Sequence, residues 1–198
     1  MSDHDVAQIY NQLPTIEEAD RRFSTNRDTI LSQLAPLMRK YHNQFGVCLV
    51  HAHCKIEPGE KMVSIGNISE PLRGVECYPE SWLSNANAYE FSITPTSLPP
   101  PELFNDFQKI IGDVGVLGLY YAGGRAEGVS LEWTEGRRNI TKSITRAEGE
   151  RHIQTAWIPG SDPHLTKSCE PCVVCDSTTT RNSTTHKGTQ TSLHREYK

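Results

Sequence analysis

The chain has 198 residues, of which 36% are hydrophobic, and it carries a formal net charge of −4 with an isoelectric point of about 6.1. This length is enough for one compact domain with a hydrophobic core, and the acidic balance excludes a general electrostatic affinity for nucleic acid or anionic membranes. No apolar run approaches the roughly 18–20 residues of a membrane span, and residues 1–5 lack the features of a secretory signal. We therefore expect a cytoplasmic or nuclear protein that is not secreted and has neither nucleic-acid nor membrane partners.

Helical patterns dominate the chain from about residue 5 to residue 44. Thr15 and Glu18 have the spacing of a capping box, in which each side chain bonds the backbone N–H of the other residue. From about residue 25 to 42 the apolar residues recur at helical spacing and predict an amphipathic helix: Ile30, Leu31, Leu34, Leu37 and Met38.

Strand patterns begin after residue 44. A turn at residues 57–60, with the sequence Glu-Pro-Gly-Glu, predicts a hairpin between the first two strands. One more helix is expected over residues 101–111, where prolines precede a second helical pattern. The candidate strands cover residues 47–55, 61–65, 89–94, 116–122, 129–135 and 152–157.

The order of these elements predicts an α+β fold, with N-terminal helices packed on a mainly antiparallel sheet. We expect one domain over residues 1–160, because the composition changes near residues 159–163. Residues 161–198 then form a tail that contains cysteine and histidine and is rich in serine and threonine. Almost nothing after Cys175 is apolar, so the tail is expected to be flexible and disordered unless a metal organises it.

His51 and His53 form the most informative pair of residues in the chain. In a strand over residues 47–55 they project from one face, while Cys48 and Val50 project from the other. Two imidazoles on a rigid element can hold zinc or another divalent metal, given a third ligand, or can move a proton. The alternative is a structural role, in which both histidines are hydrogen-bonded on a sheet face.

Glu132 and His152 are the candidate catalytic partners of this pair. Glu132 lies on the polar face of the strand over residues 129–135, where it can orient an imidazole or act as a base. Arg137 and Arg138 follow in the next turn, and their guanidinium groups either hold an anionic substrate or form surface salt bridges.

The spacing of His51, His53 and Glu57 is H-x-H-x3-E, which resembles part of the first metal motif of the cupins. This resemblance implies a barrel-shaped metal enzyme in which His152 supplies the histidine of the second motif. The upstream spacing from Gly46 is one residue short, and alanine replaces the proline of the second motif at residue 147. A cupin-like enzyme is therefore one alternative.

Cys169, Cys172 and Cys175 are spaced C-x2-C-x2-C. In a reducing compartment cysteines are thiols or metal ligands before they are disulfides. Thiolates at this spacing can share one tetrahedral ion, and His186 would complete a Cys3His zinc site. An iron–sulfur loop, thiol redox chemistry and a tail of reactive thiols without an ordered metal are the alternatives.

Residues 49–53 and 59–63, together with Trp82 and residues 89–91, resemble a run found in uncharacterised small proteins of filamentous fungi. This resemblance implies a fungal origin and carries no activity. Two functions therefore stay open. The first is a metal-binding protein or enzyme built on His51 and His53. The second is a non-catalytic interaction or accessory protein with structural histidines and a tail that binds zinc or a partner.

Overall fold

The computed structural model describes residues 3–123, 129–144, 153–159 and 166–169, and every structural statement below concerns these residues. The described part contains four α-helices and one short 3-10 helix. Thr15 and Glu18 form the expected capping box at the start of the second α-helix, with both reciprocal hydrogen bonds present. The helices are α1 (Asp3–Asn11), α2 (Ile16–Phe23), η1 (Ser24–Asn26), α3 (Arg27–Lys40) and α4 (Pro101–Ile111).

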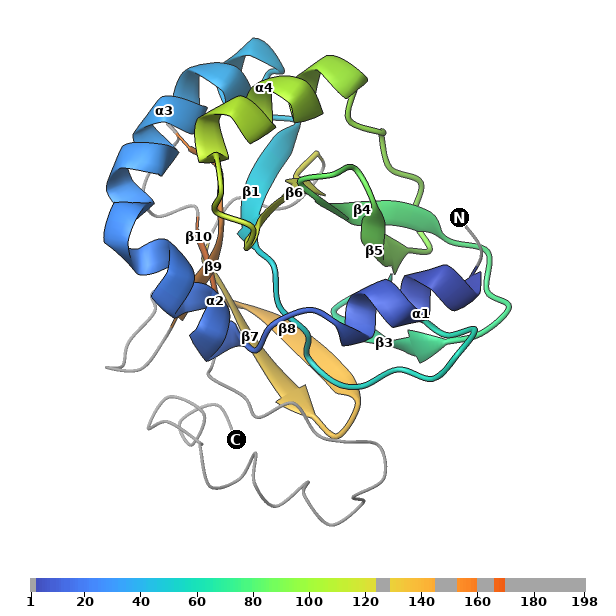
Figure 1. Ribbon diagram of the computed structural model, residues 1–198. Helices are drawn as coiled ribbons and strands as arrows, with labels where there is room; N and C mark the ends of the chain where they lie inside the picture. The colour runs from blue at the N-terminus through green and yellow to red at the C-terminus, as the bar shows by residue number, and fades with distance from the viewer. Residues whose placement is uncertain (1–2, 124–128, 145–152, 160–165, 170–198) are drawn as a thin grey trace.

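The strands of the described residues close into a barrel, in the order β1-β6-β4-β5-β2-β3-β8-β7-β10-β9 (Figure 1). Neighbouring strands are antiparallel except for the parallel pairs β2–β5 and β7–β10. The strands are β1 (Phe45–Leu49), β2 (Lys61–Ile65), β3 (Ile68–Leu72), β4 (Tyr78–Leu83), β5 (Ala88–Ser92), β6 (Leu117–Tyr121), β7 (Val129–Glu135), β8 (Arg138–Ile144), β9 (Ile153–Trp157) and β10 (Thr166–Cys169).

The expected hairpin between the first two strands is wrong. β1 pairs with β6 and β9, whereas β2 pairs with β3 and β5. The hairpin lies one strand later, where Gly66 at a φ of +63° and Asn67 join β2 to β3. Glu57-Pro58-Gly59-Glu60 does form a turn, closed by the backbone bond from Glu60 N–H to the Glu57 carbonyl, but the chain before it has already left the sheet.

The main hydrophobic core lies outside the barrel, between its outer surface and three helices. Phe23 of α2, Leu34 of α3 and Phe107 of α4 are fully buried against outward-facing residues of β1 and β6, such as Val47 and Leu119. Figure 1 shows α3 and α4 side by side along this part of the barrel, and the two helices are in contact. One sheet face is thus buried by helices, as hydrophobic burial requires.

A second, smaller cluster closes one end of the barrel. Helix α1 contacts β2 and β5, and its Tyr10 is fully buried with residues of the segment that follows β1. The Tyr10 hydroxyl accepts a hydrogen bond from the backbone N–H of His53 at 3.2 Å. The side chains of this cluster are Ala7, Tyr10, Val50, Ala52, Cys54, Ile56, Met62 and Tyr89. We call this end the floor of the barrel.

Gly118 of β6 shows how closely the elements approach each other. A Cβ atom at this position would lie 2.4 Å from the carbonyl oxygen of Trp82 and 2.9 Å from Val50 Cγ2. The first of these atoms belongs to the backbone and cannot turn aside. Glycine is therefore required here by close packing of β4 against β6.

The α+β class and the mainly antiparallel sheet are confirmed, and the helix over residues 101–111 has the expected bounds. Strands β3, β4 and β8 were not expected. Strand β10 lies beyond the expected domain end at residue 160, so the barrel extends at least to Cys169. The tail from residue 170 onward lies outside the described residues. No helix in the described part is long and apolar enough to cross a membrane.

Candidate functional site

A cavity of about 470 Å³ lies inside the barrel. Its lining takes one or more side chains from every strand between β1 and β9, which only the inner face of a closed barrel can provide. The lining is mostly polar: Ser64, Ser69, Ser81, Ser92, Ser130, Asn139, Thr141 and Ser143 contribute hydroxyl or amide groups. We call this space the inner cavity.

The inner cavity is buried at one end and open at the other. The pairing of the strands places Leu49, Lys61 and Glu135 at the floor end, and Ile65, Ser92 and Tyr121 at the opposite end. At that opposite end, Gly66, Asn67, Thr94 and Pro95 line the cavity and are exposed. His51 and His53 lie at the floor with 6% and 3% of their surface exposed. A ligand would enter between the exposed loops and reach the histidines last.

The two histidines follow β1 and are held by backbone and side-chain contacts. His51 Nδ1 lies 2.7 Å from the carbonyl oxygen of Leu49. A carbonyl only accepts hydrogen bonds, so Nδ1 carries the proton, and in the neutral ring Nε2 carries the lone pair. The rings of His51 and His53 meet edge to face with centroids 4.6 Å apart. His53 Nε2 lies 3.9 Å from Glu90 Oε1.

The predicted separation of Cys48 from the histidines is wrong. Cys48 lines the same inner cavity as His51 and His53. The prediction assumed a strand through residue 55, but β1 ends at Leu49 and the alternation of faces ends with it. The later backbone leaves the sheet, and its N–H groups at Val50 and Ala52 bond to the carbonyls of Val116 and Pro14.

Glu132 lines the inner cavity, as predicted from the sequence for a site residue. It is 4% exposed, and its Oε1 accepts a hydrogen bond from the Thr141 hydroxyl at 2.9 Å. The Glu90 carboxyl group comes near an imidazole, that of His53. Glu90 was missed because the strand 88–92 alternates Tyr, Glu and Phe, and the sequence alone does not tell which face turns inward.

Asn139 is a second residue that the sequence did not single out. It is 3% exposed and lines the inner cavity, and its Oδ1 has no hydrogen-bond partner among the described residues. A buried polar atom without a partner costs free energy, so such atoms are rare and point to a missing partner. Residues 139–141 match a glycosylation motif, but no pattern in the sequence marks Asn139 as part of a site.

Tyr89 and Cys48 form a polar contact on the cavity wall, with 3.4 Å between the phenol oxygen and the sulfur. Burial raises the pKa of the Tyr89 phenol well above its ordinary value, and the nearby Cys48 and Glu90 raise it further. The phenol therefore keeps its proton at neutral pH and serves the cavity as a neutral hydrogen-bonding group.

Arg137 and Arg138 do not line the inner cavity. Arg137 donates hydrogen bonds to the Glu60 carboxylate and to the carbonyl oxygen of Lys55. It thereby connects the segment over residues 55–60, next to the floor, to the turn between β7 and β8. Arg138 pairs with Glu70 on the outside. The salt-bridge alternative is therefore the one that the structure supports. Burial by itself would raise the pKa of Glu60, but the hydrogen bonds from Arg137 and from Glu57 N–H outweigh it and lower the pKa.

Of the remaining predicted residues, Glu57 and Cys169 belong to the described part of the chain and the others do not. Glu57, the cupin-like carboxylate, is about half exposed, is paired with Arg73, and does not line the inner cavity. Cys169 ends β10, where only its backbone is described. His152, Cys172, Cys175 and His186 lie outside the described residues.

The described residues contain no group of three or more His, Cys, Asp or Glu side chains arranged to hold a metal. The zinc site of the tail stays a prediction.

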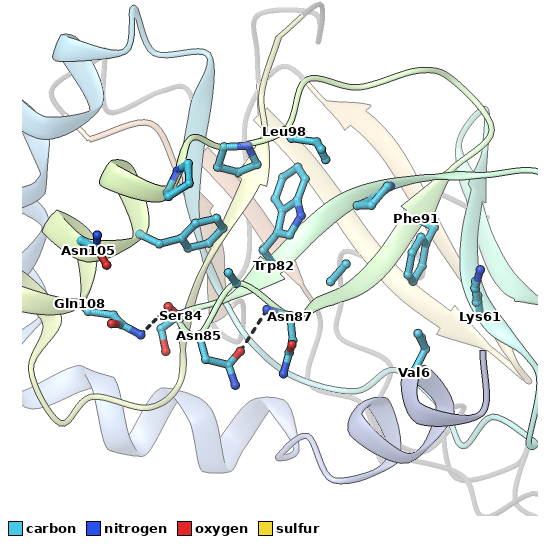
Figure 2. A pocket seen from close by; sticks show the side chains of 16 residues that line it. Val6, Lys61, Trp82, Ser84, Asn85, Asn87, Phe91, Leu98, Asn105 and Gln108 are labelled. Atoms are coloured by element: carbon cyan, nitrogen blue, oxygen red, sulfur yellow. Dashed lines mark hydrogen bonds between the residues drawn. The ribbon is translucent and has the colours of Figure 1, made fainter. Parts of the chain in front are cut away.

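A second cavity, of about 640 Å³, lies on the outer surface between α4, α1 and the β4–β5 hairpin (Figure 2). Trp82, Phe91 and Leu98 supply apolar surface, while amide side chains from the hairpin turn and from α4 line the other side. Lys61 is the only ionisable side chain among the described residues of this lining. We call it the outer cavity. It holds far fewer groups that could do acid–base chemistry than the inner cavity does.

Comparison of the chain with protein families, with curated proteins and with solved structures finds no match. The inner cavity, with its two histidines and buried carboxyl groups, therefore carries the functional argument.

Proposed function

We propose that the protein binds a small polar molecule inside the barrel. The observation that carries this proposal is the buried Asn139 Oδ1, which lines the inner cavity and has no partner among the described residues. A core filled for stability alone would place apolar side chains at such positions, because unmatched polar groups are costly to bury. The volume of about 470 Å³ lies in the range of small-molecule sites.

The mouth and floor support the same function. Exposed loops surround the open end, whereas the histidines lie at the buried end and Glu132, farther along the wall, is only 4% exposed, so a bound molecule would be enclosed by protein on most sides. Chemical groups that fix the orientation of a ligand then lie where water is most fully excluded.

Amide chemical shifts of the labelled protein test this proposal with a panel of small polar compounds of mixed charge. We expect the bound compounds to shift amides of β2, β3, β5 and β8. The variant Ser69→Phe places a bulky ring near the open end of the inner cavity, where a ligand would enter, and should abolish these shifts, and Ser64→Phe on the paired strand should repeat the effect. Ser84→Phe, in the outer cavity, is the matched control. Shifts confined to the outer cavity, or unchanged in both inner variants, would refute the proposal.

A metal ion held by His51 and His53 is a second candidate function. The bond from His51 Nδ1–H to the Leu49 carbonyl is the arrangement that commonly orients a metal-binding imidazole. The described residues supply these two nitrogen ligands, and a third would be required.

Elemental analysis of the purified full-length protein separates this candidate from the first. The wild type should hold a close to stoichiometric amount of metal that is missing from the double variant His51→Ala, His53→Ala, in addition to any metal that the tail cysteines bind in both proteins. His42→Asn is a suitable control, because His42 is exposed and asparagine tolerates its φ of +55°. Equal metal content in all three proteins would contradict the histidine metal site and leave the small-molecule proposal intact.

A further inference from the structure

The charge of the inner cavity indicates which small molecules it would accept. Its lining contains the carboxyl groups of Glu80, Glu90 and Glu132, two imidazoles and, among the described residues, neither lysine nor arginine. An anionic ligand entering this space would meet carboxyl groups and, among the described residues, no basic side chain of lysine or arginine to pair with, so it would be disfavoured.

Two basic side chains near the floor, those of Arg137 and Lys55, are engaged outside the cavity. Arg137 binds Glu60 and the Lys55 carbonyl, and the Lys55 ammonium donates to the Asn11 carbonyl at 2.9 Å. Their hydrogen bonds thus hold the charged groups of Arg137 and Lys55 away from the inner face of the barrel. The acidic lining is a property of the folded barrel and is not evident from the net charge of −4.

Hydrogen-bonding groups in the cavity favour a ligand that donates. Carboxyl oxygens of Glu90 and Glu132 line the cavity and accept hydrogen bonds. Asn139 Oδ1 is another acceptor, and the hydroxyl of Thr141 is already directed to Glu132. Acceptors and carboxyl groups together match a group with several N–H donors and a positive charge.

We infer that the inner cavity binds a small organic amine in its ammonium form, with Glu90 and Glu132 beside it and Asn139 as a hydrogen-bond acceptor. This inference rests on the proposed function. An ammonium group supplies three donors and one positive charge in a compact volume. The aromatic rings of Tyr89 and Tyr120 line the same cavity, and aromatic faces attract cations further.

Three probes of matched shape test this inference: 2-phenylethylamine, 2-phenylethanol and 3-phenylpropionate. Binding is measured at pH 7 on the full chain by amide chemical shifts, with the affinity taken from the titration. We expect the amine to bind at least about tenfold more tightly than the alcohol and the carboxylate not to bind, because the charge complements the lining only for the amine.

Variants identify the groups responsible. Glu132→Gln keeps an oxygen that can accept from Thr141, and Glu90→Gln provides a second variant on another strand. Each should weaken amine binding by about tenfold while leaving the weaker alcohol binding nearly unchanged. Glu135→Gln is the matched control, because Glu135 ends the same strand as Glu132 and is exposed.

The possible failures are distinct. Binding of the alcohol or the carboxylate in the inner cavity as tightly as the amine would overturn the amine class and leave the small-molecule site standing. Amine shifts that persist in Ser69→Phe would overturn the site itself. Absence of amine binding to the wild type, or equal binding in both glutamate variants and the control, would also overturn the inference.

Discussion

The two faces of the barrel wall are built for different purposes. The outer face of β1, β6 and β9 carries Val47, Leu119 and Trp157 against α2, α3 and α4, and all three side chains are almost fully buried. The inner face of the same strands carries Cys48, Tyr120 and Ala156 around a polar cavity. Apolar burial on the outer face supplies the driving force for folding. The inner face is therefore free to carry groups that a stabilising core would exclude.

The comparison also explains why a polar barrel interior is tolerated. Many inner-face groups are serine and threonine hydroxyls, which can bond each other, as Ser64 and Ser69 do at 2.8 Å. The floor is closed by a separate apolar cluster that includes Tyr10 and Met62. Stability and ligand chemistry are thus divided between regions, and substitutions in each should have different consequences.

The largest effect is expected from truncating the outer core. Phe107→Ala removes a fully buried ring from the helix–barrel interface and should lower the free energy of unfolding by about 3–5 kcal/mol. Ser81→Ala, a buried inner-face change, should cost less than about 1 kcal/mol. Urea denaturation of both variants measures the contrast, and similar losses in the two would contradict the division between the faces.

A smaller effect of opposite sign is expected on the inner face. Asn139→Leu removes a buried oxygen without a partner among the described residues and should raise the free energy of unfolding by about 1.5 kcal/mol. Asn85→Leu is the comparison, because the Asn85 side chain accepts from Asn87 N–H in an exposed turn, and its loss should destabilise slightly. A marked destabilisation by Asn139→Leu, measured in urea, would show that this oxygen is satisfied in the folded protein.

The ion pair between Glu60 and Arg137 joins the floor to the β7–β8 turn, and its contribution to the free energy of unfolding should depend on pH. Because the pKa of Glu60 is lowered in the folded state, the unfolded chain binds more protons below the ordinary value of about 4.5. The contribution of Glu60 is thus present above that pH and is lost as the pH falls through the lowered pKa.

Glu60→Gln should remove this contribution, costing about 1 kcal/mol at neutral pH and flattening the acid limb of the stability curve. Urea denaturation between pH 3 and 7 measures it. Glu57→Gln, in an exposed pair with Arg73, serves as control and should cost less than about 0.5 kcal/mol. Parallel acid limbs in the wild type and Glu60→Gln would exclude Glu60 as their source.

The smallest effect is expected at the rim of the outer cavity. Ala86 has a φ of +69° in the turn between β4 and β5, a conformation that an L side chain rarely adopts. Ala86→Gly relieves this strain but increases the conformational entropy of the unfolded chain. The free energy of unfolding should therefore rise by only about 0.5 kcal/mol. Gly66→Ala introduces a side chain at a φ of +63° and should lower the free energy of unfolding. A thermal melt that ranks the two variants in the opposite order would contradict the assignment of strain.

Local signals were sufficient for some elements. The capping box at Thr15 and the proline-led helix over residues 101–111 depend on contacts within one or two turns, and both were predicted from sequence. Strands β2 and β7 also have the predicted bounds. Strands β3, β4 and β8 escaped prediction because their inward positions carry Ser, Glu, Asn and Thr, which do not give the apolar alternation of an ordinary half-buried strand.

The sequence by itself determined the α+β class and the helices that have local capping signals, and it singled out His51 and His53 as candidate site residues. Only the tertiary structure decided that the strands close into a barrel, that β1 ends before the histidines, and that Glu90 and Asn139 join them in one cavity. The physical reason is the range of the interactions. Capping and periodicity act over a few residues, whereas the pairing of strands and the choice of inner face depend on contacts between residues far apart in the chain.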